Sequence, residues 1–160
     1  MLVNERMTRN PITIRPDMPV TEAQALLKRE HIHHLPVLDK DDRLVGIVTE
    51  KALLYASPSP ATTLSVYEMT SLLSKLKVEK VMTTKLITVT EEVPIEEAAR
   101  IMADSGVGGL PVMRGRVLVG IITESDLFRV FIELFGARQK GVRLSLRVPN
   151  EKGSLAKITA

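Results

Sequence analysis

An internal repeat is the feature that most restricts how this chain can fold. When the segment that begins at Met7 is laid on the segment that begins at Met82, residue types coincide at many positions. The matching stretches include Leu35-Pro36-Val37 with Leu110-Pro111-Val112 and, after a one-residue deletion, Gly46-Ile47 with Gly120-Ile121. A unit that occurs only twice, and is longer than a solenoid repeat, predicts a pseudo-symmetric pair of small units and not an extended array.

Both copies predict the same order of elements, β-α-β-β-α. In the first copy Val20, Ala23 and Leu27 recur at helical spacing, and β-rich runs flank that stretch on both sides. The predicted strands lie at 12–14, 35–38 and 44–48 in the first copy, and at 86–89, 110–113 and 116–122 in the second. A last helix starts after Thr49 and again after Thr123. The predicted fold class is therefore α+β, with the two repeats packed as a pseudo-two-fold pair.

Domain boundaries follow from the repeat and from the loop-forming residues between its copies. The prediction is a first repeat at 1–56, a connecting insert at 57–77, a second repeat at 78–136 and a separate segment at 141–160. Prolines and serines open the insert, and a helix is predicted from Ser65 to Lys77. The last segment begins with strand-like alternation, but a piece of this length cannot close a core alone. We expect it to be part of a truncated domain.

Composition excludes several classes of function. Hydrophobic residues make up 44% of the chain and charged residues 26%, which is typical of a folded globular protein. The absence of cysteine excludes disulfides and thiolate metal sites. The net charge is only +3, the cations are interspersed with anions, and aromatic residues are few, so no nucleic-acid partner is predicted. No apolar run is long enough to span a membrane, and the sequence is interpreted as cytoplasmic.

The repeated motifs resemble those of the tandem CBS (cystathionine-β-synthase) domain pair, also called a Bateman module, over residues 1–136. The resemblance is carried by Val3-x-x-x-Met7 and Val78-x-x-x-Met82, by the Leu-Pro-Val strands, and by Gly46-Ile47-Val48-Thr49 and Gly120-Ile121-Ile122-Thr123. The stretch from Val142 to Ala160 resembles the beginning of an ACT domain. A CBS pair followed by ACT is similar to bacterial proteins labelled as acetoin utilisation proteins. The resemblance implies a regulatory, non-catalytic module.

The stretch Thr123-Glu124-Ser125-Asp126 opens the last predicted helix and is the strongest candidate for a ligand site. With Thr123 at the N-cap, free N–H groups and the positive end of the helix dipole favour a phosphate. Asp126, one turn in, can accept hydrogen bonds from both hydroxyls of a ribose. The alternative is a capping box, which stabilises many helices that bind nothing. The resemblance favours the site, because the ribose-binding Asp of the family falls on Asp126.

The resemblance also implies the rest of this site. Pro11 and Ile12 would frame an adenine with their backbone, and Ile32 and His33 would pack beside it. Gly108 and Gly109 would allow close approach, or would line the phosphate side with Thr123 and Ser125. The implied ligand-binding residues are Pro11, Ile12, Ile32, His33, Gly108, Gly109, Thr123, Ser125 and Asp126.

The first copy departs from this pattern, because Ala52 stands where the second copy has Asp126. An alanine side chain offers no acceptor to a ribose. The second, pseudo-equivalent cleft would use Thr49, Lys51, Ile87 and Val107, and His33 or His34 could face its phosphates. We expect that cleft to bind weakly or not at all.

The sequence leaves several alternatives open. His31, His33 and His34 could bind a transition metal, although adjacent strand positions point to opposite faces and no cysteine completes a site. No nucleophile elbow, Walker lysine loop or dinucleotide fingerprint is present, so no enzyme activity is predicted.

The expected partners and ligands come from the family. No cofactor is predicted, and the expected regulatory ligand is an adenine nucleotide, AMP foremost, with ADP, ATP or S-adenosylmethionine as alternatives. A flat homodimer formed through the CBS repeats is expected, together with an unidentified regulated protein. The competing hypothesis is a ligand-free dimerisation scaffold, which would be indifferent to the loss of Asp126.

Overall fold

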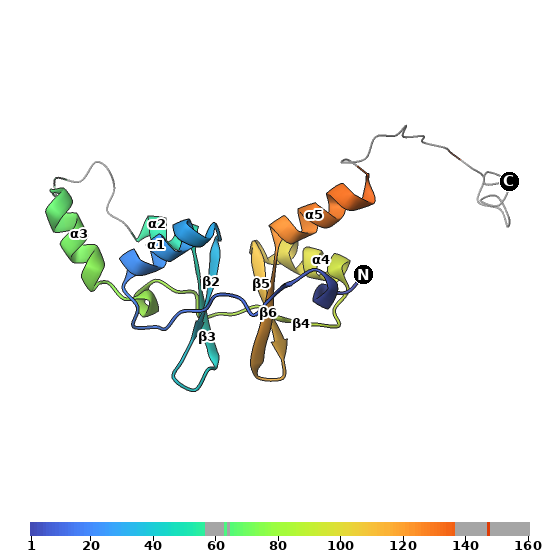
Figure 1. The fold of residues 1–160 in the computed structure, drawn as a ribbon, viewed down its shortest axis with the longest axis horizontal. Helices are drawn as coiled ribbons and strands as arrows, with labels where there is room; N and C mark the ends of the chain where they lie inside the picture. The colour runs from blue at the N-terminus through green and yellow to red at the C-terminus, as the bar shows by residue number, and fades with distance from the viewer. Residues whose placement is uncertain (57–62, 64, 137–146, 148–160) are drawn as a thin grey trace.

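The computed structural model describes residues 1–56, 63, 65–136 and 147, which form a pair of α/β units standing side by side (Figure 1). The predicted α+β class and the pairing of two repeats are confirmed. The predicted ACT-like segment at 141–160 lies outside the described residues, apart from the isolated Arg147. None of the helices described could cross a membrane.

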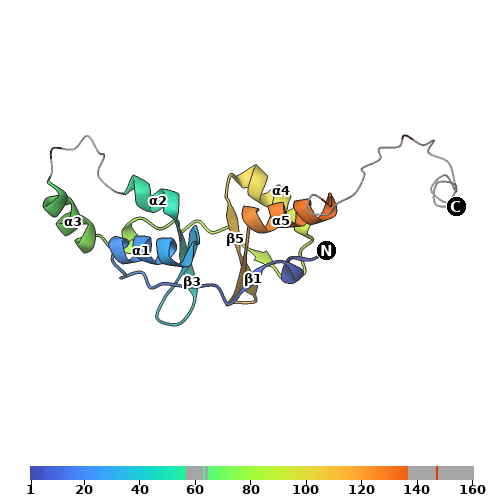
Figure 2. The same ribbon diagram turned by 45° about the horizontal axis from the view of Figure 1, so that its top comes forward.

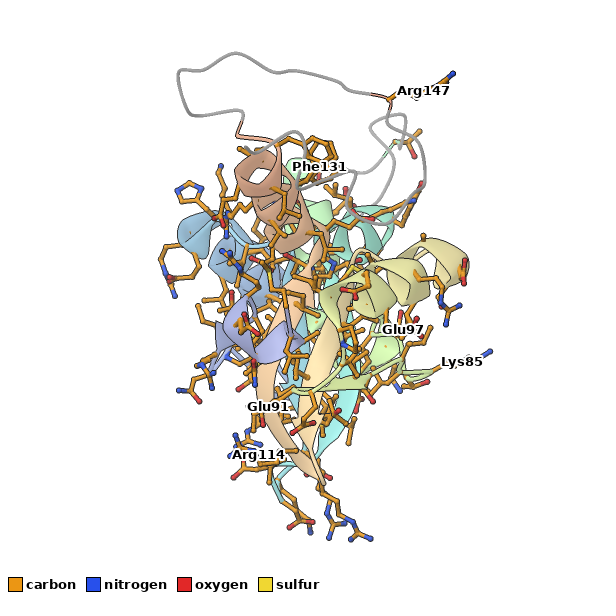
Figure 3. The ribbon with its side chains drawn as sticks, turned by 90° about the vertical axis from the view of Figure 1, so that its right-hand side faces the viewer. Lys85, Glu91, Glu97, Arg114, Phe131 and Arg147 are labelled. Carbon is orange, nitrogen blue, oxygen red and sulfur yellow. The ribbon has the colours of Figure 1, made fainter. Side chains whose placement is uncertain are left out.

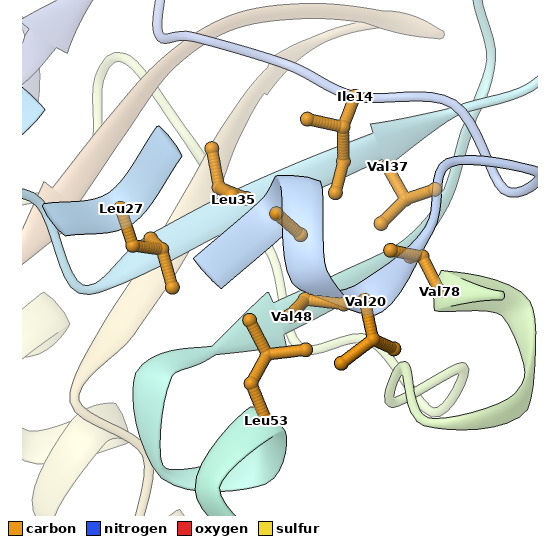
Figure 4. Close-up of a cluster of buried hydrophobic side chains, with 9 residues drawn as sticks. Ile14, Val20, Leu27, Leu35, Val37, Val48, Leu53 and Val78 are labelled. Carbon is orange, nitrogen blue, oxygen red and sulfur yellow. The ribbon is translucent and has the colours of Figure 1, made fainter. Parts of the chain in front are cut away.

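The first unit is a hairpin covered by helices. Strands β2 (His34–Leu38) and β3 (Leu44–Thr49) pair antiparallel, and helices α1 (Val20–Glu30) and α2 (Glu50–Tyr55) pack against them. Helix α3 (Val66–Lys75) belongs to the connecting insert and packs on α1. The apolar faces meet in the core drawn in Figure 4, which comprises Ile14, Val20, Ala23, Leu27, Leu35, Val37, Val48, Leu53 and Val78.

The second unit repeats this plan with a larger sheet. Strands β5 (Gly109–Arg114) and β6 (Val117–Thr123) form the hairpin, and helices α4 (Ile95–Ser105) and α5 (Glu124–Leu134) pack beside it. Strands β1 (Thr8–Arg9) and β4 (Val89–Thr90) complete the sheet order β1-β6-β5-β4. The turns of the two repeats correspond too: the residues that follow α1 and α4, His31 and Gly106, both have the left-handed conformation.

Each unit is completed by the segment that precedes the other unit in the chain, an arrangement called here the segment exchange. Val3, in the 3₁₀ turn Val3–Glu5, and Met7 are buried in the core of the second unit, although they begin the first half of the chain. Val78, in the 3₁₀ turn Val78–Lys80, is buried in the core of the first unit, and Met82 packs against it. The N-terminal ribbon accordingly lies against the second unit in both views (Figures 1 and 2). Each core is therefore incomplete without a segment from the other half.

The predicted first strands of the two copies are largely wrong. In place of a strand at 12–14, only Ile14 forms a bridge, parallel to Val37. Pro11 and Pro16 flank this stretch and have no N–H to give to a ladder, which limits it to the two hydrogen bonds that Ile14 makes. In the second copy the strand predicted at 86–89 is the two-residue β4, which pairs parallel with β5. The remaining strands and helices lie close to their predicted positions.

Candidate functional site

A cleft of about 600 Å³ lies between the two units and is named here the Asp126 cleft. Its walls come from four parts of the chain: the stretch before α1, the link from α1 to β2, the residue before β5, and the end of β6 with the start of α5. The cleft is lined by Thr8, Asn10, Pro11, Ile12, His31, Ile32, His33, His34, Gly108, Ile121, Thr123, Glu124, Ser125, Asp126 and Arg129. Residues far apart in the sequence are thus brought together because the repeats face each other.

The start of α5 is fixed by the strand before it. Strand β6 ends at Thr123, which has an extended backbone, and the helix begins at the next residue. The N–H of Glu124 donates to the carbonyl oxygen of Gly108 over 3.1 Å, which ties the helix to the start of β5. The first turn of this helix, with its positive dipole end, therefore faces the cleft.

Asp126 is only 6% exposed and is already hydrogen-bonded. Its Oδ2 accepts from the N–H of Thr123 over 2.9 Å and from the Thr123 hydroxyl over 2.7 Å. Its Oδ1 accepts from Nη1 of Arg129 over 3.1 Å. An ionised carboxylate offers about four lone-pair sites, so these three bonds leave room for about one more. Asp126 thus caps α5 and also lines the cleft. A capping box and a ligand site are therefore compatible interpretations of the Thr123-Glu124-Ser125-Asp126 motif.

The opposite wall is apolar and is shaped by tight turns. Ile12 is 39% exposed, a large aliphatic side chain left open at the cleft. Asn10 and His31 both have positive φ, 47° and 53°, which bend the chain on either side of this wall. Pro11 and Ile32 complete it. A flat apolar group of the size of a purine ring can be covered by such a surface.

The predicted site residues can now be placed. All of them except Gly109 line the Asp126 cleft. Gly109 lies on the neighbouring cleft, and its surface is covered by the His34 ring: a Cβ at Gly109 would stand 3.1 Å from the Cδ2 atom of His34. Arg129 was not predicted, although its position three residues after Asp126 on a helix is a signal that could have found it.

A second cleft of about 470 Å³ adjoins the first. It contains the residues expected there, Thr49, Lys51, Ile87 and Val107, together with Lys85 and Glu50. Ala52 occupies the helical position that corresponds to Asp126, and its N–H donates to the hydroxyl of Thr49 over 3.1 Å. His33, His34, Gly108 and Glu124 line both clefts. The two clefts therefore share a wall.

The shared wall carries the titratable groups. Nδ1 of His33 lies 2.7 Å from Oε2 of Glu50. Burial lowers the pKa of His34, the neighbouring His33 lowers it further, and the carboxylate of Glu124 partly opposes both effects. Within the stretch of chain that the structure describes, no three His, Cys, Asp or Glu side chains are grouped so as to hold a metal ion.

Fold and cleft together define a paired module, assembled from two copies of one α/β unit with a cleft between them. The family model of the CBS domain matches residues 3–59 and 78–133. The chain therefore belongs to the CBS domain family, with two such domains in tandem.

The relatives of this chain differ in how much of their length the CBS pair makes up. A CBS domain-containing protein of Dictyostelium discoideum is 35% identical over 84% of this chain and 93% of its own length. The L-aspartate semialdehyde sulfurtransferase of Methanocaldococcus jannaschii is 30% identical over 81% of this chain, which spans only 23% of that enzyme. A CBS pair of this kind thus occurs both as most of a protein and as a portion of a larger one.

Solved structures show the same fold. A Vibrio cholerae protein named as acetoin utilization protein AcuB has a TM-score of 0.72 and 31% identity, covering 88% of this chain and 98% of its own. A CBS domain pair in complex with 5′-methylthioadenosine and S-adenosyl-L-methionine has a TM-score of 0.69 and 30% identity, covering 87% and 98%. CBSX2 in complex with AMP has a TM-score of 0.68 and 27% identity, covering 84% and 98%.

Proposed function

We propose that this protein is a regulatory module that binds an adenine nucleotide, AMP foremost, in the Asp126 cleft. The observation that carries the proposal is the buried carboxylate of Asp126 at the wall of a cleft built by both repeats. Related CBS pairs were solved with AMP and with two other adenosine compounds, which supports adenosine as the common element. The cleft volume of about 600 Å³ suits a ligand of this size.

Each portion of the ligand has a complementary surface in the cleft. The apolar wall at Pro11, Ile12 and Ile32 would cover the adenine ring. Asp126 has about one acceptor site left and would accept a hydrogen bond from a ribose hydroxyl, as short carboxylates do well. The N–H and hydroxyl of Ser125, at the start of α5, would receive the phosphate, because those of Thr123 are donated to Asp126.

A ligand in this cleft would act by joining the two repeats. The apolar wall comes from the first half of the chain, whereas the carboxylate and the helix N-terminus come from the second. A ligand that binds one relative orientation of the repeats better than another shifts their equilibrium by its difference in affinity. We propose a regulatory and non-catalytic role, in which an adjoining domain or a partner protein senses this orientation.

The second cleft would bind such a ligand more weakly. With Ala52 in place of an aspartate, it offers no carboxylate to the ribose at the equivalent helical position. Removing a hydrogen-bond acceptor of this kind costs about 1.5–3 kcal/mol, which is roughly ten- to hundredfold in affinity.

The test is calorimetric titration of AMP, ADP, ATP and S-adenosylmethionine into the wild type, Asp126→Asn and Asp41→Asn. Asp126→Asn keeps the side-chain shape and removes the charge. We expect its affinity for the nucleotide to be about tenfold or more below that of the wild type. Asp41→Asn makes the same chemical change in the exposed β2–β3 turn and should bind like the wild type. Failure of every adenine compound to bind the wild type would refute the proposal.

A second candidate function has one observation in its favour. Helix α5 exposes Phe128, Phe131 and Leu134, and the next residue, Phe135, extends this apolar surface. Such patches mark protein interaction sites. A ligand-free dimerisation scaffold would use this surface and would self-associate equally well in wild type and Asp126→Asn.

A further inference from the structure

The fixed charges of the Asp126 cleft do not by themselves favour a phosphate. Among the side chains that line it, Glu124 and Asp126 are anionic and Arg129 is the permanent cation. Arg129 is already bound to Asp126, 3.1 Å from its Oδ1. An anionic ligand would therefore meet an excess of negative side-chain charge, offset by the positive end of the α5 dipole. A further positive charge would have to come from a histidine.

His34 is the histidine placed to supply it. Its ring lies over Gly109, and its Nε2 stands 3.5 Å from the position that a Cβ on Gly108 would take. Oε2 of Glu124 stands 3.2 Å from the same position. The ring nitrogen and the carboxylate thus converge on Gly108, whose carbonyl oxygen receives the first N–H of α5. This is the end of the cleft where a phosphate would bind.

The charged groups around His34 come from several elements. His33 precedes it on the same segment and is bound to Glu50 of α2, and Glu124 approaches from α5. Lys51 and Lys85 line the far side of the shared wall, and Figure 3 draws the Lys85 side chain extending outward from the molecule. The pKa of His34 is lowered, mainly by burial. Burial therefore disfavours the charged form of this ring in the unliganded protein, and an anion beside it would favour that form.

We propose that the Asp126 cleft is selective for anionic, phosphate-bearing adenosine compounds, and that His34 takes up a proton when such a compound binds. This inference rests on the proposed function. A phosphate monoester carries about −1.5 to −2 charges near neutral pH, and an anion next to an imidazole favours its charged form. Neutral 5′-methylthioadenosine would give no such uptake, and cationic S-adenosylmethionine would oppose it. His34 is thus a specificity-determining residue.

The sign of the pH dependence follows from linkage. Because the complex holds a proton that the free protein lacks, affinity for AMP rises as pH falls from 8 to 6.5. The second ionisation of a phosphate monoester, near pH 6, contributes its own pH dependence, but equally to all variants. The difference between wild type and His34→Gln therefore isolates His34. Asp41→Asn, in the exposed β2–β3 turn and outside both clefts, is the control variant.

The experiment is calorimetry of AMP binding at pH 8, 7 and 6.5, at each pH in two buffers of different ionisation enthalpy. We expect wild type and Asp41→Asn to take up a fraction of a proton at pH 7. Between pH 8 and pH 6.5 their affinity for AMP should rise about threefold or more beyond any rise in His34→Gln. An NMR titration of the His34 ring in the wild type, with and without AMP, measures the same proton without a variant.

The outcomes separate this inference from the proposed function. Equal proton uptake in wild type and His34→Gln, or an unchanged His34 titration when AMP is added, would overturn the role of His34 while leaving nucleotide binding intact. S-adenosylmethionine binding more tightly than AMP at pH 6.5 would overturn the selectivity. If no adenosine compound binds at any pH, the proposed function itself fails.

Discussion

The sulfur of Met82 lies 2.5 Å from the position that a Cβ on Gly46 would take, so this methionine occupies the space of the missing side chain. The relationship is repeated by pseudo-symmetry, with the sulfur of Met7 2.5 Å from the corresponding position on Gly120. Both contacts join one repeat to the segment that precedes the other. They therefore fix the position of each exchanged segment on the unit that it completes.

The first prediction concerns this contact. Gly46→Ala should lower the free energy of unfolding by about 1–3 kcal/mol, because the added methyl group must displace a packed methionine. Urea denaturation followed by circular dichroism measures the change. In the double variant Gly46→Ala with Met82→Ala, the cost of the added methyl should largely disappear, as the neighbour that it strikes is gone. Strictly additive effects of the two substitutions would contradict this account.

The second prediction concerns Asp126 as a helix cap. Asp126→Ala should destabilise the protein by about 1 kcal/mol without any nucleotide, because the N–H and hydroxyl of Thr123 lose their acceptor. Ser125→Ala changes an exposed residue of the same turn and should stay within about 0.5 kcal/mol. Urea denaturation without ligand is the measurement. An unchanged midpoint for Asp126→Ala would mean that the carboxylate serves only the cleft.

The third prediction is an acid dependence carried by Glu91, which is 5% exposed and lies near the β5–β6 turn. Arg114 donates to both of its oxygens, over 2.6 and 3.0 Å, and the two residues are labelled in Figure 3. These hydrogen bonds lower the pKa of Glu91. A lowered folded-state pKa contributes stability above the ordinary carboxyl pKa, and this stability is lost as pH falls through the folded value.

Arg114→Met should therefore be less stable than the wild type at pH 7, and the difference should shrink as pH falls below 4.5, the ordinary value for Glu91. Thermal denaturation at pH 7, 5, 4 and 3 measures it. Arg116→Met, in the turn that follows Arg114, is the matched control. A constant difference between wild type and Arg114→Met across this range would show that the contribution of Arg114 is packing and not charge.

The repeat made much of the fold predictable. Helices α1 and α4 follow from apolar residues at helical spacing, and the corresponding strands follow from the two Leu-Pro-Val motifs. The expected site residues come from the resemblance to the CBS pair and not from the repeat, and the cleft brings Ile12 and Ile32 together with Asp126. Local pattern and internal symmetry were sufficient for the fold but not for the site.

The segment exchange could not be predicted in the same way. Val3 and Val78 begin equivalent stretches, so each would satisfy the apolar pattern of either core. The choice depends on chain connectivity and on long-range packing, which local periodicity does not contain. The same limit applies to His34 over Gly109, because the repeat aligns these residues as equivalents without showing that they touch.

The last prediction concerns the exposed face of α5, through which we propose that two copies associate. Phe131 is 57% exposed, lies 4.4 Å from the ring of Phe135 between centroids, and is labelled on the outer surface in Figure 3. A charged residue at the centre of an apolar interface costs about 2 kcal/mol or more, which is roughly thirtyfold in affinity. Phe131→Glu should therefore shift the protein toward the monomer in sedimentation velocity.

The matched control is Tyr67→Glu, which places the same charge on an aromatic residue that is 84% exposed on α3. That helix belongs to the connecting insert, at the other end of the molecule (Figure 1), and its variant should sediment like the wild type. If Tyr67→Glu dissociates the dimer and Phe131→Glu does not, the interface lies on the insert. Because exposed positions tolerate substitution well, both variants should unfold at nearly the wild-type urea concentration, and a change in sedimentation then reports association alone.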